Sequence, residues 1–269
     1  MSNRVTDDVE QHRKTYDEHG YIVFRNIVPK AQLQELHASL MKEFERVSQD
    51  GSLFAGGGLI SGHLNCFPGE QCRFIHEALQ ERGIEDLIRE LSPKSMKTLN
   101  LGCNFNLPGS VAQHYHADGL FTEDFTIANV AVIDTTIENG AIDLLPGTHK
   151  RFYPYWQFAV ERVSRLSTRI PMQQGDVLVR SSVTWHRGMP NKTKAPRPMV
   201  AFTYGEKHDN RVDGDPFKHN GGKIAFLPNW YSPNLLGRLR ERTFVKAPIT
   251  YSAYRFARSL VGNKGYATF

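Results

Sequence analysis

The feature that most constrains the fold is a series of short apolar runs, separated by turns rich in glycine, proline and asparagine. Short runs at this spacing are typical of an all-β sandwich or barrel. They lie at residues 98–107, 125–134, 141–145, 176–180 and 198–204. We therefore expect a mainly β core flanked by helices.

The segment before this core is predicted to be helical. Thr6 can cap a short helix that ends near Gly20, a strand-like run follows at 21–24, and Pro29 opens a second helix at a position that proline tolerates. An apolar stripe at helical spacing marks the core side of that second helix. Its members are Leu33, Leu36, Leu40, Phe44 and Val47. Two shorter helices are expected over 73–92.

Residues 51–70 are rich in glycine, but no Gly-Lys-Ser/Thr follows them, so a phosphate-binding loop is excluded. A flexible loop beside a pocket is the prediction for this segment. Because no linker interrupts the chain, we expect one domain over residues 1–269. It would comprise a mostly helical part (1–96), a β core (97–205) and a basic, partly helical part (206–269).

Charge is distributed unevenly along the 269 residues. The net charge is +5, yet the stretch from Arg238 to the end holds seven basic residues and one acidic residue, so the rest of the chain is close to neutral. This pattern argues against a nucleic-acid binder, which spreads its bases over a face of the fold. It leaves open a basic tail that meets an anionic substrate or touches a membrane surface.

Three cysteines without a C-x-x-C pair argue against a disulfide framework and against a structural zinc site. No apolar run is long enough to span a membrane, and the first residues contain no apolar segment of a secretory signal. We therefore expect a cytoplasmic protein with reduced cysteines.

The stretch from Gln113 to Gly119 carries the most chemical information. In extended backbone, residues two apart point to the same side, so His116 and Asp118 can present a nitrogen and an oxygen to one point. Two such ligands and a distant histidine form the facial triad that holds non-heme Fe(II). Taken alone, the triplet is equally compatible with an exposed His–Asp pair near a turn.

Two later residues extend this pattern. His186 lies ten residues after Asp176, and Arg197 lies eleven residues further on, at the start of an apolar strand. A guanidinium in a core strand needs a carboxylate, because a bidentate pair compensates its desolvation. A keto-dicarboxylate bound to iron would supply that carboxylate; a structural salt bridge is the alternative.

Together these motifs resemble the phytanoyl-CoA dioxygenase-like branch of the Fe(II)/2-oxoglutarate-dependent oxygenases. The matching features, in order, are the triplet 116–118, the segment 139–150 (NGAIDLLPGTHK), Gly175-Asp176 leading to His186, and the run 186–197. The resemblance covers 97–205 well and the N-terminal region more loosely, whereas the tail after 206 matches nothing in the family.

The resemblance implies a double-stranded β-helix (jelly-roll) core. It implies that His116, Asp118 and His186 are the catalytic iron ligands and that Arg197 binds the far carboxylate of 2-oxoglutarate. Asn104 and Asn106, which share a strand face, are further candidates for binding this cosubstrate. The implied reaction consumes O₂, decarboxylates 2-oxoglutarate to succinate, and hydroxylates or otherwise oxidises an aliphatic C–H bond.

The implied substrate is a small or carrier-linked metabolite. Because Asp118 is present, the resemblance favours oxidation over halogenation, for which the related halogenases carry a small residue at this position. Candidate substrate contacts are His63, Asn65, His114, Asp143 and Arg255. For Asp143 a solvated strand position is the alternative, and for Arg255 a packed helix with solvated bases.

Two other functions stay open. The chain could be a non-catalytic member of the fold that binds a ligand or partner through its tail. It could also be a cupin-type iron enzyme that uses His114 and His116 and needs no 2-oxoglutarate. The second alternative lacks its usual glutamate, because Glu123 lies seven residues beyond His116.

Overall fold

The computed structural model describes residues 5–49, 61–92, 98–122, 125–205, 214–227 and 234–262. The α-helices are α1 (Val9–His19), α2 (Lys30–Gln49), α3 (Arg73–Glu81), α4 (Ile84–Leu91), α5 (Tyr155–Val160), α6 (Leu235–Lys246) and α7 (Pro248–Leu260). Among the described residues, no helix combines the length and the apolar character needed to cross a bilayer.

The strands are β1 (Tyr21–Phe24), β2 (His63–Phe67), β3 (Thr98–Asn106), β4 (Thr126–Ala131), β5 (Asp143–Leu144), β6 (Thr168–Arg169), β7 (Val177–Ser181), β8 (His186–Arg187), β9 (Arg197–Gly205) and β10 (Ala225–Leu227). They form a larger sheet in the order β1-β7-β4-β9-β3-β2-β10 and a smaller sheet in the order β6-β5-β8. The paired strands are antiparallel. This two-sheet arrangement confirms the predicted jelly roll.

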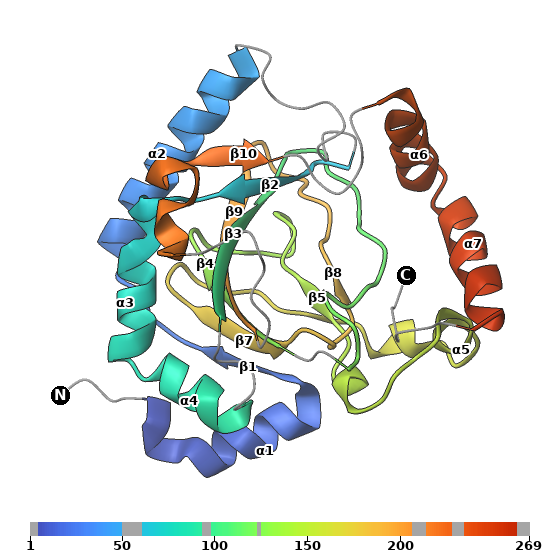
Figure 1. Cartoon of the computed structure of the whole chain (residues 1–269), viewed down its shortest axis with the longest axis horizontal. Coiled ribbons are helices and arrows are strands. Elements are labelled where there is room, and N and C mark those ends of the chain that lie inside the picture. Colours follow the sequence, from blue (N-terminus) through green and yellow to red (C-terminus); the bar gives the residue numbers. More distant parts are fainter. Residues whose placement is uncertain are drawn as a thin grey trace.

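Helices lie on both sides of the barrel. Figure 1 shows α1 to α4 along one side of the larger sheet, whereas α5, α6 and α7 lie beyond the smaller sheet. The outer face of the larger sheet is apolar and packs against the predicted stripe of α2, as in the shared core cluster of Leu36, Val200 and Phe202. The opposite face of this sheet is turned toward the barrel interior, where the candidate site residues gather.

The N-terminal helices agree with the sequence prediction except at the start of α1. Gly20, with φ of 80°, caps α1 in the left-handed conformation that glycine adopts without strain. Pro29 directly precedes α2, and α3 and α4 fill the region predicted to hold two short helices. The predicted cap was wrong: Thr6 lies within a short 3₁₀ helix, and Asp8 is the residue that precedes α1.

The prediction for the segment after α2 was also wrong. The segment 51–70 is not a loop throughout, because His63–Phe67 forms strand β2 between β3 and β10. Leu64 and Cys66 point into the apolar core, which stabilises an extended conformation. Residues 51–60, which include the glycine run, lie outside the described part of the chain.

Candidate metal centre

Two chain segments far apart in sequence bring three candidate ligands together. His116 forms an isolated antiparallel bridge with His186 on β8, closed by two backbone hydrogen bonds of 2.9 Å. The Asp118 amide donates to the Ser182 carbonyl at 2.9 Å, which fixes the end of the same segment. The ladder therefore places all three predicted ligands at one point of the barrel.

The geometry suits a metal ion. One ligand atom from each of His116, Asp118 and His186 lies within 4.8 Å of the others. The His116 Nε2–Asp118 Oδ1 distance is 3.6 Å, and the His186 Nε2–Asp118 Oδ2 distance is 3.4 Å. Ligand atoms on one face of an octahedral site lie about 3 Å apart, so a small contraction would accommodate an ion.

Both imidazoles are held in the tautomer that a metal ligand needs. Nδ1 of His116 lies 2.8 Å from the His114 carbonyl, and Nδ1 of His186 lies 3.0 Å from the Thr184 carbonyl. A carbonyl only accepts, so each Nδ1 carries the proton and each Nε2 offers a lone pair. This donor set fits Fe(II), for which two histidines and a carboxylate are the usual facial triad.

Asp118 is held by an arginine that the sequence analysis did not consider. Arg180 Nη2 donates to Asp118 Oδ2 at 2.6 Å, and Arg180 Nε donates to Asn129 Oδ1 at 3.0 Å. Only 5% of the Arg180 side chain is exposed, against 28% for Asp118. The guanidinium therefore orients the carboxylate from inside the barrel while the carboxylate stays reachable from solvent.

The surroundings of the cluster favour the protonation states that bind a cation. Burial, together with repulsion from His186, lowers the pKa of His116 to about 3, so its imidazole is neutral at pH 7. Burial alone would raise the pKa of Asp118, but His186 and Arg180 outweigh it and hold this pKa well below its usual range. A neutral imidazole and an ionised carboxylate are the forms that bind metal.

A second group of polar residues lies on the inner face of the larger sheet. Asn106 on β3 pairs with Arg197 on β9 and with His63 on β2, so the three residues form one row across adjacent strands. They are 0%, 2% and 4% exposed, respectively. Asn106 Nδ2 donates to the Met189 carbonyl at 3.0 Å, which connects this row to the segment after His186.

Each member of this row carries a buried polar atom that has no hydrogen-bond partner among the described residues. The atoms are Nε and Nη1 of Arg197, Oδ1 of Asn106 and Nδ1 of His63. Arg197 Nη2 donates to the Gly140 carbonyl at 3.0 Å, and burial lowers the pKa of Arg197 to about 10. A buried guanidinium with two unused nitrogens is unfavourable unless an anion completes it.

Asn104 and Asn65 occupy the next row. They pair with each other across β3 and β2, and Asn104 also pairs with Met199 on β9. Asn104 therefore shares the strand face of Asn106, as predicted, one strand repeat further along. Asn65 is exposed and Asn104 is half-buried, so these amides lie nearer to solvent than the Arg197 row.

Asp143 does not occupy the solvated position that the sequence suggested as its alternative. It is fully buried, and its carboxylate accepts from the Tyr115 hydroxyl (2.8 Å), Ser167 Oγ (2.6 Å) and Arg187 Nε (2.9 Å). Three donors satisfy this carboxylate within the protein. Asp143 therefore connects the segment that carries His116, through Tyr115, with the segment that carries His186, through Arg187.

The remaining candidates, His114 and Arg255, lie where the C-terminal helices contact the segment that carries His116. His114 Nε2 lies 3.2 Å from the Phe244 carbonyl of α6, so the ring does not join the three-ligand cluster. Arg255 on α7 is 2% exposed and packs among aromatic rings. That burial separates it from the exposed bases of the tail, such as Arg240, Lys246 and Arg258. Contact of the tail with a membrane surface stays a prediction.

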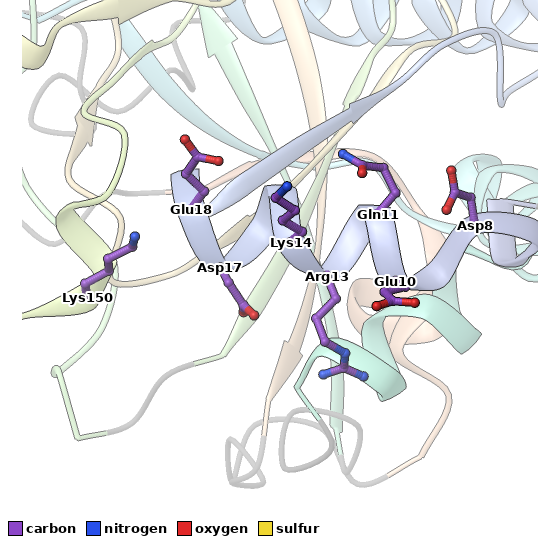
Figure 2. A pocket seen from close by; sticks show the side chains of 8 residues that line it. All are labelled: Asp8, Glu10, Gln11, Arg13, Lys14, Asp17, Glu18 and Lys150. Atoms are coloured by element: carbon purple, nitrogen blue, oxygen red, sulfur yellow. The ribbon is translucent and has the colours of Figure 1, made fainter.

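A separate surface hollow lies along α1. It is lined by Asp8, Glu10, Gln11, Arg13, Lys14, Asp17, Glu18 and Lys150, whose side chains are drawn in Figure 2. None of these residues belongs to the ligand cluster or to the Arg197 row. Its lining is polar and mostly charged, and it lies apart from the barrel interior.

Barrel and cluster together define a jelly roll with a two-histidine, one-carboxylate cluster that is a candidate metal centre. The model of one family, described as Phytanoyl-CoA dioxygenase (PhyH), matches residues 16–199. The chain belongs to this family. The match ends near the start of β9, and the C-terminal helices lie beyond it.

Two curated relatives are similar over part of the chain. One is the dioxygenase lolE1 of Epichloe uncinata, which is 30% identical over 131 residues, covering 44% of this chain and 49% of the relative. The other is a methylphosphonate hydroxylase of Gimesia maris, which is 30% identical over 109 residues, covering 38% of this chain and 42% of the relative. The chain thus matches less than half the length of either relative.

Solved structures agree on the fold. The epimerase SnoN, in complex with Fe³⁺, alpha ketoglutarate and nogalamycin RO, superposes with a TM-score of 0.56 at 16% identity, covering 81% of this chain and 96% of SnoN. The alpha-ketoglutarate-dependent carbocyclase SnoK superposes with a TM-score of 0.55 at 16% identity, covering 73% of this chain and 83% of SnoK. At this identity the similarity establishes the shared architecture.

Proposed function

We propose that the chain is an Fe(II)/2-oxoglutarate-dependent dioxygenase that oxidises an aliphatic C–H bond of a small or carrier-linked metabolite. One observation carries the proposal: a two-histidine, one-carboxylate cluster shares a barrel interior with a buried arginine that has two unused nitrogens. Iron ligands and an anion-binding group are the two elements that this chemistry requires.

The residues divide the work as follows. His116, Asp118 and His186 would hold Fe(II), and Arg197 would bind the far carboxylate of 2-oxoglutarate, with Asn106 and Asn104 beside it. Bound iron with 2-oxoglutarate and O₂ supplies an oxidant strong enough for unactivated C–H bonds, with release of succinate and CO₂. Arg180 keeps Asp118 ionised and oriented.

Family membership and the names of the relatives support the same class of reaction. A dioxygenase and a hydroxylase are among the curated relatives, and the neighbouring structures are described as alpha-ketoglutarate-dependent. Those names also span dissimilar substrates, so they leave the metabolite open. Hydroxylation is the outcome that we propose, with other oxidations of the same C–H bond as variants of it.

The first experiment is an anaerobic titration with Fe(II) and 2-oxoglutarate. The wild-type chain should develop a metal-to-ligand charge-transfer band in the visible range, and Asp118→Ala should not. His114→Ala serves as the control, because its ring contacts α6 and lies outside the cluster. Absence of the band in the wild-type chain would favour a non-catalytic role or a cupin-type site. Loss of Fe(II) binding in His114→Ala would then identify the cupin-type site.

The substrate calls for a second experiment. A panel of metabolites that includes phosphonates and carrier-linked acids would be screened for substrate-dependent release of succinate, with Asp118→Ala as the background. Succinate above this background identifies the substrate class. Iron-loaded protein that binds 2-oxoglutarate yet releases none with any compound would point to the non-catalytic alternative.

A further inference from the structure

The C-terminal helix α7 contacts the segment that carries His116. Arg255 Nη1 donates to the Tyr115 carbonyl at 2.8 Å, and Tyr115 directly precedes His116. The Tyr251 ring, one helical turn earlier on α7, packs against the His114 ring with 4.6 Å between the two centroids. α7 therefore meets the first ligand segment at the two residues that lead into His116.

The same arginine also lies beside the segment that carries His186. Its guanidinium carbon is 4.0 Å from the ring centroid of Tyr155 on α5 and 5.6 Å from that of Trp185. Trp185 directly precedes His186 and is 1% exposed, stacked on Phe158 at 4.1 Å. One buried side chain thus touches the residue before each of the two histidines.

A further contact fixes the position of α7 against α5. Ser259 Oγ accepts from the backbone amide of Trp156 at 2.9 Å, so α7 is fixed to α5 at its far end. Burying a guanidinium costs several kcal/mol of desolvation free energy. A cation–π contact with a well-placed aromatic ring offsets about 2 kcal/mol or more of this cost. Arginine suits this position because its planar group can stack on rings and donate to a carbonyl at once.

We propose that Arg255 is a positioning residue for the metal centre, and that docking of α7 is thermodynamically linked to metal occupancy. The inference rests on the proposed function, because it takes the His116–Asp118–His186 cluster as the metal site. An ion holds the two histidine segments at a fixed separation, and Arg255 spans the residues next to them. Linkage is reciprocal, so bound metal favours docked α7 and docked α7 favours bound metal.

The experiment measures metal affinity and helix docking in the full-length chain. Fe(II) dissociation constants come from anaerobic competition with a chelator, and the exposure of α7 comes from hydrogen–deuterium exchange with and without Fe(II). Arg255→Met is compared with Arg258→Met, which removes the same charge from an exposed position on the same helix. Arg258 donates a 2.9 Å hydrogen bond to the hydroxyl of Tyr254 on the same helix.

Arg255→Met should raise the dissociation constant for Fe(II) by about 10- to 100-fold, the range found when partners behind metal ligands are removed. Arg258→Met should leave the dissociation constant within about twofold of the wild-type value. Arg255→Lys should recover part of the lost affinity, because lysine keeps the positive charge. The recovery should be incomplete, because lysine lacks the planar group that stacks on the aromatic rings. In the wild-type chain, Fe(II) should slow exchange across α7; in Arg255→Met this protection should disappear.

Two outcomes would overturn the inference alone: wild-type protein that binds Fe(II) without any change in α7 exchange, or equal effects of Arg255→Met and Arg258→Met on the dissociation constant. The wild-type exchange measurement needs no variant, so poor folding of Arg255→Met would not remove the test. A wild-type chain that binds no Fe(II) would instead overturn the proposed function and this inference with it.

Discussion

Arg180 and Asp118 form an ion pair across 62 residues of sequence, with 2.6 Å between Nη2 and Oδ2. The arginine emerges from β7, is held by Asn129 on β4, and reaches the carboxylate from the barrel interior. The carboxylate of the candidate metal centre is therefore already paired with a cation before any metal binds. This arrangement makes Asp118 the ligand whose geometry depends most on the assembled barrel.

Replacing Arg180 by methionine should destabilise the metal-free protein, because Asp118 loses its cation. Breaking a buried pair costs about 3–5 kcal/mol, and the partial exposure of Asp118 places the expected loss near the lower end. Urea unfolding measures it. Arg151→Met is the control, since Arg151 pairs with Glu161 at the surface, where such a pair contributes about 0–1 kcal/mol. Similar losses in both variants would contradict the role assigned to Arg180.

Arg197→Met should have opposite effects on stability and on cosubstrate binding. The variant removes a buried cation whose Nε and Nη1 are unused, so the ligand-free protein should gain about 1 kcal/mol or more in unfolding free energy. Binding of 2-oxoglutarate, followed by calorimetry under anaerobic conditions with Fe(II), should weaken by at least about 100-fold because charged hydrogen bonds are lost. Unchanged binding would exclude Arg197 as the carboxylate site.

Gly140→Ala should disturb the Arg197 site through the backbone. Gly140 has φ of 89°, and a Cβ there would lie 2.5 Å from the Met189 carbonyl oxygen and 2.6 Å from Asn106 Nδ2. Gly109 is the matched control, with φ of 74° and open space around the same position. Gly109→Ala should cost only the left-handed strain of about 1–2 kcal/mol. Gly140→Ala should cost distinctly more in denaturant unfolding and should weaken 2-oxoglutarate binding, because the Gly140 carbonyl accepts from Arg197.

The stability of the metal-free protein should fall as the pH drops below about 6.5, and His63 should account for part of the loss. Burial lowers the pKa of His63 to about 4, so between this value and the unfolded pKa the unfolded chain binds the proton and the folded chain does not. Stability therefore rises with pH across this window, by about 2 kcal/mol between pH 5 and pH 7 for this residue.

Urea unfolding of His63→Phe at the two pH values checks this prediction. The variant should show a smaller difference in unfolding free energy than the wild-type chain, whereas His219→Phe, at an exposed position, should retain the full difference. If His63→Phe kept the wild-type pH dependence, the buried imidazole would not be the titrating group.

The ligand cluster could be predicted from sequence because its information is local. His116 and Asp118 are two residues apart in extended backbone. His186 lies on β8, and Arg197 follows eleven residues later at the start of β9. The strands of the core were recognised from their apolar runs for the same reason. β2 was missed because its five residues are extended only through pairing with β3 and β10.

Long-range partners explain the other differences. Arg180 lies in an apolar strand, like Arg197, and the same argument would have flagged it, but nothing in the sequence identifies Asp118 as its partner. Asp143 was expected to be solvated or to touch substrate, yet its donors come from three separate segments. Buried ion pairs of this kind depend on which strands become neighbours, and no local sequence pattern specifies the strand order.

The hydrogen bonds that the two Nδ1 atoms donate orient the histidines from within their own chain segments. Each imidazole donates from Nδ1 to a carbonyl two residues earlier in its own segment, so the contact that orients the ring is local in sequence. The carboxylate acquires its orientation only after β7 has joined the sheet beside it. At the proposed metal site, tight binding would therefore require the closed barrel, and a bound ion would stabilise the finished fold relative to partly folded precursors.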